Sequence, residues 1–197
     1  MHKCNWPGME KPLYTRYHDE EWGVPVHNDQ QLFEMLILEG MQAGLSWYTI
    51  LNKRENFRNA LDNFDYKLIA KYDESKIEEL MQNTGIIRNR LKLKACVTNA
   101  MAFMEIQKEF GTFDKYIWGF IDFKPIINKF KTLDELPAKT ELSDIISKDL
   151  KKRGFKFIGS TVVYAHMQAT GMVNDHLTHC FRYKEIINID GNNVAIK

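Results

Sequence analysis

Hydrophobic and polar positions along most of this 197-residue chain recur with the period of an α-helix. The clearest case is "NDQQLFEMLILEGMQAG", which is apolar almost all round between Leu32 and Leu38. A helix that is apolar on every side is buried on every side. Asn28 or Asp29 is suited to cap its first turn, because a side-chain oxygen there can accept from a free backbone N–H group. The pattern therefore predicts a buried helix near the start of the chain.

The same periodicity predicts helices over most of the remaining sequence. We expect them after a cap at Ser46, over "DESKIEELMQNTG", from about Ile87 to Phe110, over "FDKYIWGFI", from a Ser143 cap to Gly154, and from a Ser160 cap to Gly171. Gly85 is expected to end the second of these in a left-handed conformation. Residues 122–142 contain two prolines and read as a connecting segment. Strand patterning is nearly absent, so the predicted fold class is all-α.

The carboxyl-terminal residues give the one strand-like signal. In "EIINIDGNNVAIK", an Asp-Gly dipeptide lies between alternating apolar residues, which is typical of a short hairpin. A loose chain end is the alternative.

Composition narrows the functional classes. The 27 Lys and Arg residues are balanced by 26 Asp and Glu residues, so a nucleic-acid partner would have to bind a local basic patch. The sequence shows neither a signal-peptide pattern nor an apolar run long enough to span a bilayer. We therefore expect no membrane association and a cytoplasmic location. The three cysteines are then more consistent with thiols or metal ligands than with disulfides.

The stretch "NDHLTHC" suggests half of a metal site. His176 and Cys180 are four residues apart, a spacing that lets two side chains on one helical turn reach one zinc ion, and His179 competes for the same role. A closed site needs further ligands, for which Cys4 and His18 are the best candidates. The alternative is a surface histidine, a frayed terminal thiol and a small buried cysteine, and spacing alone favours that alternative.

A buried acid surrounded by aromatic residues forms the second constellation. Glu39 follows an apolar run, and a carboxylate in the interior is costly unless it is paired or awaits a ligand. The aromatic residues on either side of it in the sequence are Trp6, Tyr14, Tyr17, Trp22 and Trp47. Together they could form a pocket for a flat hydrogen-bonding ring such as a nucleobase. The alternative is an aromatic core in which backbone amides satisfy one glutamate.

A basic helical hairpin is the third constellation of candidate functional residues. "NTGIIRNRLKLK" turns at Gly85 and then opens a helix with Arg88, Arg90 and Lys92. The first N–H groups of such a helix and the nearby cations suit phosphate, as in a helix-hairpin-helix that grips a DNA backbone. The same charges could instead form the solvated face of an amphipathic helix. A second basic stretch, "LKKRGFKF", allows the same two interpretations.

Taken together, these segments resemble one family. The blocks "YHDEEWGVP", "LFEMLILEGMQAGLSW", "GIIRNRLK" and "LKKRGFKFIGSTVVYAHMQATGMVNDH", with the final cysteine, are similar in order to the bacterial 3-methyladenine DNA glycosylase I family. The resemblance covers roughly residues 1–182 and implies a helix-hairpin-helix glycosylase fold, with two helical lobes around a base-binding cleft. Residues 183–197 extend beyond it.

The resemblance also implies roles for individual residues. It implies one structural zinc ion that joins the chain ends through Cys4, His18, His176 and Cys180. Glu39 would bind the edge of a flipped base as the central catalytic residue, with Trp47 and Tyr17 stacking on the ring. The remaining pocket walls would be Tyr14, Trp22 and Trp6, and the DNA-backbone contacts would be Gly85, Arg88, Arg90 and Lys92.

The implied activity is base excision. A member of this family flips 3-methyladenine out of duplex DNA and hydrolyses its bond to deoxyribose, leaving an abasic site and free 3-methyladenine. The hairpin lacks the lysine that lyase-type relatives use as nucleophile, so we expect a monofunctional enzyme. We also expect a monomer. It has one glycine where many relatives have Gly-x-Gly, and no residue stands out as a general base. The rival hypothesis is a zinc-stabilised DNA-binding module without enzymatic activity.

Overall fold

The computed structural model describes residues 2–42 and 44–193, and its regular structure is almost entirely helical, which confirms the all-α prediction. The α-helices are α1 (Pro12–Glu20), α2 (Asp29–Gln42), α3 (Trp47–Ala60), α4 (Tyr66–Ile69), α5 (Glu74–Gln82), α6 (Arg90–Phe110), α7 (Phe113–Gly119), α8 (Glu141–Lys152), α9 (Ser160–Ala169) and α10 (Phe181–Asn193). Two short 3₁₀ helices lie at Asp62–Phe64 and Leu133–Glu135.

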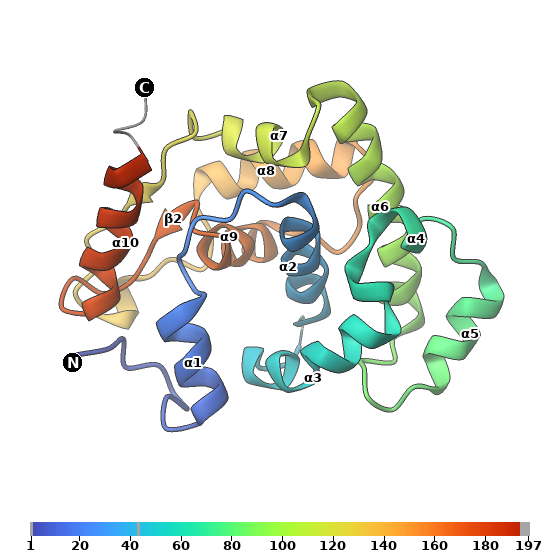
Figure 1. The fold of residues 1–197 in the computed structure, drawn as a ribbon, viewed down its shortest axis with the longest axis horizontal. Helices are drawn as coiled ribbons and strands as arrows, with labels where there is room; N and C mark the ends of the chain where they lie inside the picture. Colours follow the sequence, from blue (N-terminus) through green and yellow to red (C-terminus); the bar gives the residue numbers. More distant parts are fainter. Residues whose placement is uncertain (1, 43, 194–197) are drawn as a thin grey trace.

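Helix α2 lies at the centre of the fold (Figure 1). It packs against α3, α6, α7 and α9, and every residue from Leu32 to Met41 is buried, as the apolar run predicted. Asn28 caps its first turn by accepting a hydrogen bond from the backbone N–H of Gln31 at 3.1 Å. Because no side of α2 faces solvent over this run, any polar residue within it enters the interior.

Two groups of helices flank α2. Helices α4 and α5 pack on α6 on one side, and α8 packs on α9 on the other (Figure 1). The residues before α1 and helix α10 lie on the same side of the molecule, and the Phe181 N–H at the start of α10 donates to the His2 carbonyl at 2.9 Å. A two-residue parallel pair, β1 (Ile126–Ile127) with β2 (Val173–Asn174), fastens the connecting segment to the residues after α9. Strands of two residues are too short to leave a periodic signal in the sequence.

Of the three predicted serine caps, only one is confirmed: the Ser160 cap of α9 is wrong by one residue, because Gly159 is the cap and Ser160 is the first residue of the helix. Ser46 caps α3, as predicted, by accepting from the N–H of Thr49. The expected Ser143 cap of α8 is wrong by three residues. Thr140 is the cap, and Ser143 completes a capping box by accepting from the Thr140 N–H. Serine and threonine are both common at the cap position. Here the two reciprocal hydrogen bonds place Thr140 at the cap and Ser143 in the first turn of the helix.

Gly85 has a different role from the one expected. Its φ is not positive, so the predicted left-handed stop is wrong. A Cβ atom at this position would lie 3.0 Å from Asn56 Cγ and from Asn83 Oδ1. Glycine is therefore required here for space, where the hairpin between α5 and α6 passes close to α3.

The hairpin predicted near the carboxyl terminus is also wrong over the described residues. Residues 181–193 form α10, and its buried residues Tyr183 and Ile186 are three apart, which is the spacing of one helical face. Apolar residues in this segment thus satisfy a helical period as well as an alternating one, and packing against the rest of the protein selects the helix. Residues 194–197 lie outside the described part.

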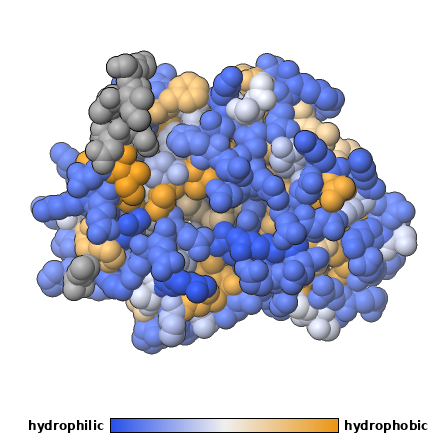
Figure 2. All heavy atoms as spheres, viewed as in Figure 1, coloured by the Kyte–Doolittle hydropathy of each residue, from blue (hydrophilic) through white to orange (hydrophobic). Residues whose placement is uncertain are grey.

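Apolar side chains are exposed only in places on the face of the molecule seen in Figure 2. Figure 2 shows a largely hydrophilic face with small, separate apolar patches. Within residues 2–42 and 44–193, no helix is both long and apolar enough to cross a membrane.

Gly171, just after α9, is the most crowded of the described glycines. It has a φ of +70°, and a Cβ there would lie 2.4 Å from Pro25 N and from Val24 C. A hydrogen bond joins the same two segments, since the Val26 N–H donates to the Thr170 carbonyl at 3.0 Å. This contact holds the segment between α1 and α2 against the end of α9.

We expect Gly171→Ala to destabilise the protein by about 3 kcal/mol, because the methyl group meets backbone atoms that cannot rotate away. Gly154→Ala is the matched control, since its φ is +98° but its Cβ would meet nothing within 4 Å. That substitution should cost only about 1 kcal/mol of backbone strain. Urea unfolding of both variants measures the difference, and equal losses would contradict the argument from close approach.

Candidate functional site

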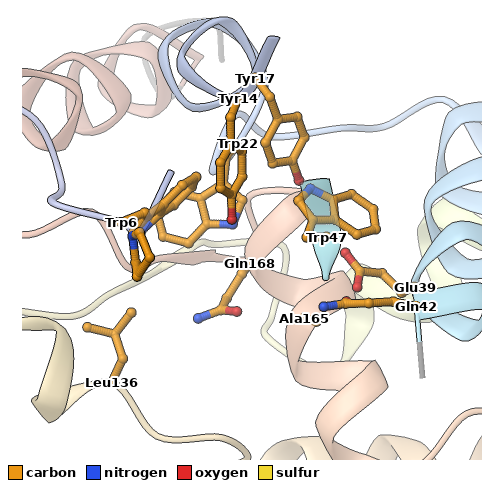
Figure 3. Close-up of a pocket in the computed structure, with 11 residues that line it drawn as sticks. Trp6, Tyr14, Tyr17, Trp22, Glu39, Gln42, Trp47, Leu136, Ala165 and Gln168 are labelled. Carbon is orange, nitrogen blue, oxygen red and sulfur yellow. The ribbon is translucent and has the colours of Figure 1, made fainter. Parts of the chain in front are cut away.

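A cavity of about 280 Å³ opens between α1, α2, α3 and α9 (Figure 3). The residues that line it are Trp6, Pro7, Tyr14, Tyr17, Trp22, Glu39, Gln42, Trp47, Leu136, Ala165 and Gln168. All six residues that the sequence suggested for a base pocket are among them, although they come from four separate segments. The cavity is large enough for one purine ring system.

Aromatic rings form most of its wall. Trp6 meets Trp22 edge-to-face with ring centroids 4.6 Å apart and lies 5.4 Å from Tyr14. Across the cavity, Tyr17 and Trp47 have centroids 5.6 Å apart. These rings pack on one another and so hold fixed orientations, which favours a flat ligand that stacks on them.

Glu39 is the acid in this wall, and only 4% of its surface is exposed. Among the described residues, no donor hydrogen-bonds its carboxyl group, so the alternative of a glutamate satisfied by backbone amides is wrong. Burial raises the pKa of Glu39 to about 8. A buried carboxyl group without a partner is costly, and here it faces a cavity that a ligand could fill.

The other polar groups of the wall are mainly donors. Burial, followed by the nearby charge of Glu39, raises the pKa of Tyr14 and that of Tyr17, so both phenols keep their protons. The Trp47 indole Nε1 is buried and has no acceptor among the described residues. The pocket thus combines stacking faces, hydroxyl and indole donors and one acid, a set suited to the polar edges of a heteroaromatic ring.

Sequence reasoning missed two polar residues of the pocket. Gln42 lies one helical turn after Glu39 on α2, so its spacing could have indicated a shared face. Gln168 lies on α9, and its amide nitrogen donates to Asp175 at 2.8 Å. No local pattern links Gln168 to Glu39, because only the packing of α9 on α2 brings them together.

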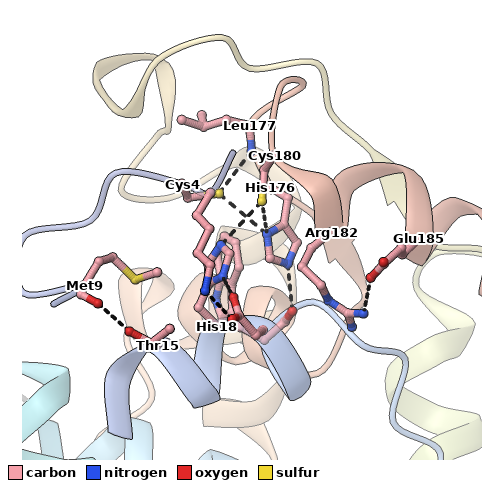
Figure 4. A network of polar contacts seen from close by, with 12 residues as sticks. Cys4, Met9, Thr15, His18, His176, Leu177, Cys180, Arg182 and Glu185 are labelled. Carbon is pink, nitrogen blue, oxygen red and sulfur yellow. Dashed lines mark hydrogen bonds and ion pairs between the residues drawn. The ribbon is translucent and has the colours of Figure 1, made fainter. Parts of the chain in front are cut away.

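The four predicted metal ligands also meet, beside the aromatic wall (Figure 4). Cys4, His18, His176 and Cys180 are all buried, and their ligand atoms lie within 4.8 Å of one another. The interpretation of a surface histidine and a frayed terminal thiol is therefore wrong. His179, which competed for a ligand position, is exposed and lies outside the cluster.

The distances suit a tetrahedral metal ion. Cys4 Sγ and Cys180 Sγ lie 3.5 and 3.6 Å from His176 Nδ1, and Cys180 Sγ lies 3.5 Å from His18 Nε2. Tetrahedral bonds to sulfur and nitrogen predict S···N separations of roughly 3.5 Å. Hydrogen bonding from Cys4 and from the two rings lowers the pKa of the Cys180 thiol, which favours the thiolate that binds a metal.

In both histidines of the cluster, the ring nitrogen that points away from the cysteines also has a hydrogen-bond partner. His18 Nδ1 lies 2.7 Å from Asp19 Oδ1, and His176 Nε2 lies 2.9 Å from the Trp22 carbonyl oxygen. Such contacts orient the inner nitrogens toward a shared ion. The cluster residues Cys4, His18, His176 and Cys180 can therefore hold one metal ion.

The cluster and the pocket share walls. The Trp6 ring lies 4.9 Å from His18, and the Trp22 ring lies 4.6 Å from His176, both edge-to-face. Two aromatic walls of the cavity therefore pack directly on candidate metal ligands.

The basic hairpin only partly matches its prediction. Arg88 is exposed, as expected, and Arg90 pairs with Glu74 and Glu78 of α5. The predicted surface position of Lys92 is wrong, because only 7% of it is exposed and its ammonium group donates to the Met41 carbonyl at 2.9 Å. A cation at the carboxyl end of α2 balances the partial negative charge of free carbonyls, which explains a buried lysine.

Comparison with known proteins agrees with this site. Residues 6–183 match the methyladenine glycosylase family model. The chain is 46% identical to DNA-3-methyladenine glycosylase 1 of Escherichia coli, over 93% of this chain and 97% of that protein. It is 51% identical to the DNA-3-methyladenine glycosylase of Haemophilus influenzae, over 90% and 96% respectively.

A solved structure shows the same fold with a base present. A variant of 3-methyladenine DNA glycosylase I in complex with 3-methyladenine superposes with a TM-score of 0.89 and is 34% identical, covering 92% of this chain and 97% of that one. With a buried acid in an aromatic pocket, and with matches over nearly its whole length, this chain belongs to the methyladenine glycosylase family.

Proposed function

We propose that this protein excises 3-methyladenine from duplex DNA by hydrolysing the bond between the base and deoxyribose. The observation that carries the proposal is the buried Glu39, which faces an aromatic cavity without a partner among the described residues. Relatives with about half of their residues identical are named for this activity. A module that only bound DNA would gain nothing from the cost of burying this acid.

The chemistry of the lesion suits the pocket. Methylation at N3 gives the purine of the intact nucleotide a positive charge. When the N9–C1′ bond breaks, its electron pair moves onto the ring and the base leaves neutral, while water adds at C1′ and gives up a proton. Because the leaving group needs no added proton, a site that binds the cationic base and excludes water already supplies much of the required selectivity.

Each predicted pocket residue has a place in this scheme. Glu39 accepts hydrogen bonds from the edge of the flipped base, and its negative form favours a cationic lesion over neutral adenine. Trp47 and Tyr17 stack on the ring from the side of α3 and α1. The outer walls are Trp6, Tyr14 and Trp22.

The hairpin between α5 and α6 is the proposed contact with the DNA backbone. Arg88 is exposed there, just before the first turn of α6, and Gly85 lets the turn pass close to α3. Arg90 would have to exchange its glutamate partners for phosphate. Lys92 is withdrawn from this role, since its ammonium group lies inside the protein.

Zinc is the metal that we propose for the cluster of Cys4, His18, His176 and Cys180. Two thiolates and two imidazoles complete a tetrahedral shell, which leaves no position for substrate and so indicates a structural role. When bound, the ion would join the segment before α1 to the segment before α10.

Replacing Glu39 with glutamine should reduce release of 3-methyladenine from methylated duplex DNA by about 100-fold or more, because a neutral amide loses the attraction for a cationic base. Glu34→Gln is the matched control. Glu34 is a buried glutamate of the same helix, but it pairs with Arg54 and Arg58 and lies outside the pocket. Chromatography of released bases gives the rates, and equal loss in the two variants would count against the role of Glu39.

Stability should respond to the two substitutions in opposite directions. The pKa of Glu39 rises on folding from 4.5 to about 8, so the native state binds more protons between these values and loses stability as the pH rises through them. Glu39→Gln should therefore stabilise the protein above pH 8, by up to roughly 5 kcal/mol, and have little effect below pH 4. Glu34→Gln should destabilise it. Thermal unfolding across this pH range tests both, and a wild-type protein that gains stability between pH 5 and 8 relative to Glu39→Gln would refute the prediction.

Removal of the metal should lower stability without stopping the reaction in molecules that stay folded. We expect chelation to cost about 3 kcal/mol or more, since the ion joins distant parts of the chain. Cys180→Ala should abolish metal binding, measured by elemental analysis. Cys96→Ala, which removes another fully buried cysteine, should retain one zinc ion per chain. Rapid loss of turnover on chelation at unchanged helicity would instead indicate a catalytic ion.

A further inference from the structure

Gln168 brings a polar side chain from α9 to the pocket, in addition to Glu39 and Gln42 of α2. Figure 3 shows its amide among the lining residues, with nitrogen and oxygen on opposite sides. The amide nitrogen donates to Asp175 Oδ2 at 2.8 Å. The orientation of this amide therefore depends on what Asp175 can accept.

Asp175 is a buried carboxylate with a complete set of donors. It is 1% exposed, and its Oδ2 also accepts from the Tyr164 hydroxyl at 2.6 Å. Burial and this hydrogen bond raise the pKa of Tyr164, which remains a donor. Asn128 Nδ2 donates to the other oxygen, Oδ1, at 2.6 Å. A carboxylate that accepts from all its neighbours can face only the NH₂ end of Gln168, because the carbonyl end would repel it.

The Gln168 carbonyl oxygen is consequently turned away from Asp175. No donor among the described residues bonds it, so it is available as an acceptor at the pocket wall. An amide held by one partner at its nitrogen presents a hydrogen-bonding pattern that cannot reverse. Such fixed patterns reject ligands of the wrong polarity more strongly than apolar contacts do.

We propose that Gln168 is a specificity-determining residue that accepts a hydrogen bond from the exocyclic amino group of the flipped adenine. Asp175 is then a positioning residue, which holds the amide in the accepting orientation. A purine with a 6-oxo group would place a second acceptor against the Gln168 oxygen and be disfavoured. The proposal rests on the proposed function, since it names the feature of the base that the same pocket selects.

The test compares binding of two free bases, 3-methyladenine and 3-methylhypoxanthine, which carry an amino and an oxo group at C6. Titration followed by tryptophan fluorescence gives both dissociation constants for the zinc-loaded, full-length protein. Wild type should bind 3-methyladenine more tightly than 3-methylhypoxanthine. Gln168→Met should reduce that preference roughly 10-fold to 100-fold, mainly by weakening the binding of 3-methyladenine. In Asp175→Asn the new amide can also donate, so the Gln168 amide is free to reverse. This variant should bind 3-methylhypoxanthine more tightly than wild type does, which reduces the preference for 3-methyladenine.

Asn128→Ala is the matched control, because it removes a donor from Oδ1 of Asp175 and leaves the Oδ2 bond to Gln168. It should lower stability while keeping the wild-type preference. A preference unchanged in folded Gln168→Met, or reduced equally in Asn128→Ala, would overturn the proposal and leave Gln168 with a structural role only. Thermal unfolding and zinc content confirm folding, since Asp175 precedes His176.

Release of 3-methyladenine from methylated DNA by the wild type is measured in parallel. Its absence would overturn the proposed function. Release that continues beside an unchanged base preference in Gln168→Met would overturn only the role of Gln168.

Discussion

The pocket of this protein depends on one buried carboxyl group, that of Glu39, and burying it costs stability. Glu39 lies near the carboxyl end of a helix covered by α3, α6, α7 and α9, and no described residue bonds to it. An isolated acid in such a place disfavours its charged form, so the free protein is less stable at neutral pH than one with an amide there. A fold that keeps this acid needs a large apolar core around α2 to offset it. The same isolation makes the group responsive to a cationic ligand, because little else competes for its charge.

Glu34, one and a half turns earlier on α2, shows the contrast. It is also buried, yet Arg54 and Arg58 from α3 bind its carboxylate at 2.7 and 2.8 Å. One helix therefore carries a glutamate that joins two helices and another left open toward a cavity. The difference lies in what the neighbouring elements supply, and it separates a structural acid from a functional one.

The pocket further depends on contacts between the two chain ends. Trp6 and Trp22 pack edge-to-face on His18 and His176, so the wall opposite α2 lies directly against the Cys and His cluster. Residues 2–11 form no regular helix or strand before α1, and a short segment of this kind gains order mainly from what it binds. A metal ion bound by the cluster would hold together the segments that carry these two rings, without itself reaching the pocket.

The sequence by itself determined the helical class and the buried course of α2, because apolar periodicity and capping residues are local signals. Its family-like blocks also named the six residues that line one pocket and the four that form one Cys and His cluster. Tertiary structure decided the rest. Lys92 is buried against the end of α2 and does not lie on the surface, and Gly85 is required for space where the hairpin passes α3. Residues 181–193 form a helix. The tertiary structure also brought Gln168 to Glu39. Each of these outcomes depends on which distant atoms lie within a few ångströms, and a one-dimensional pattern does not contain that information.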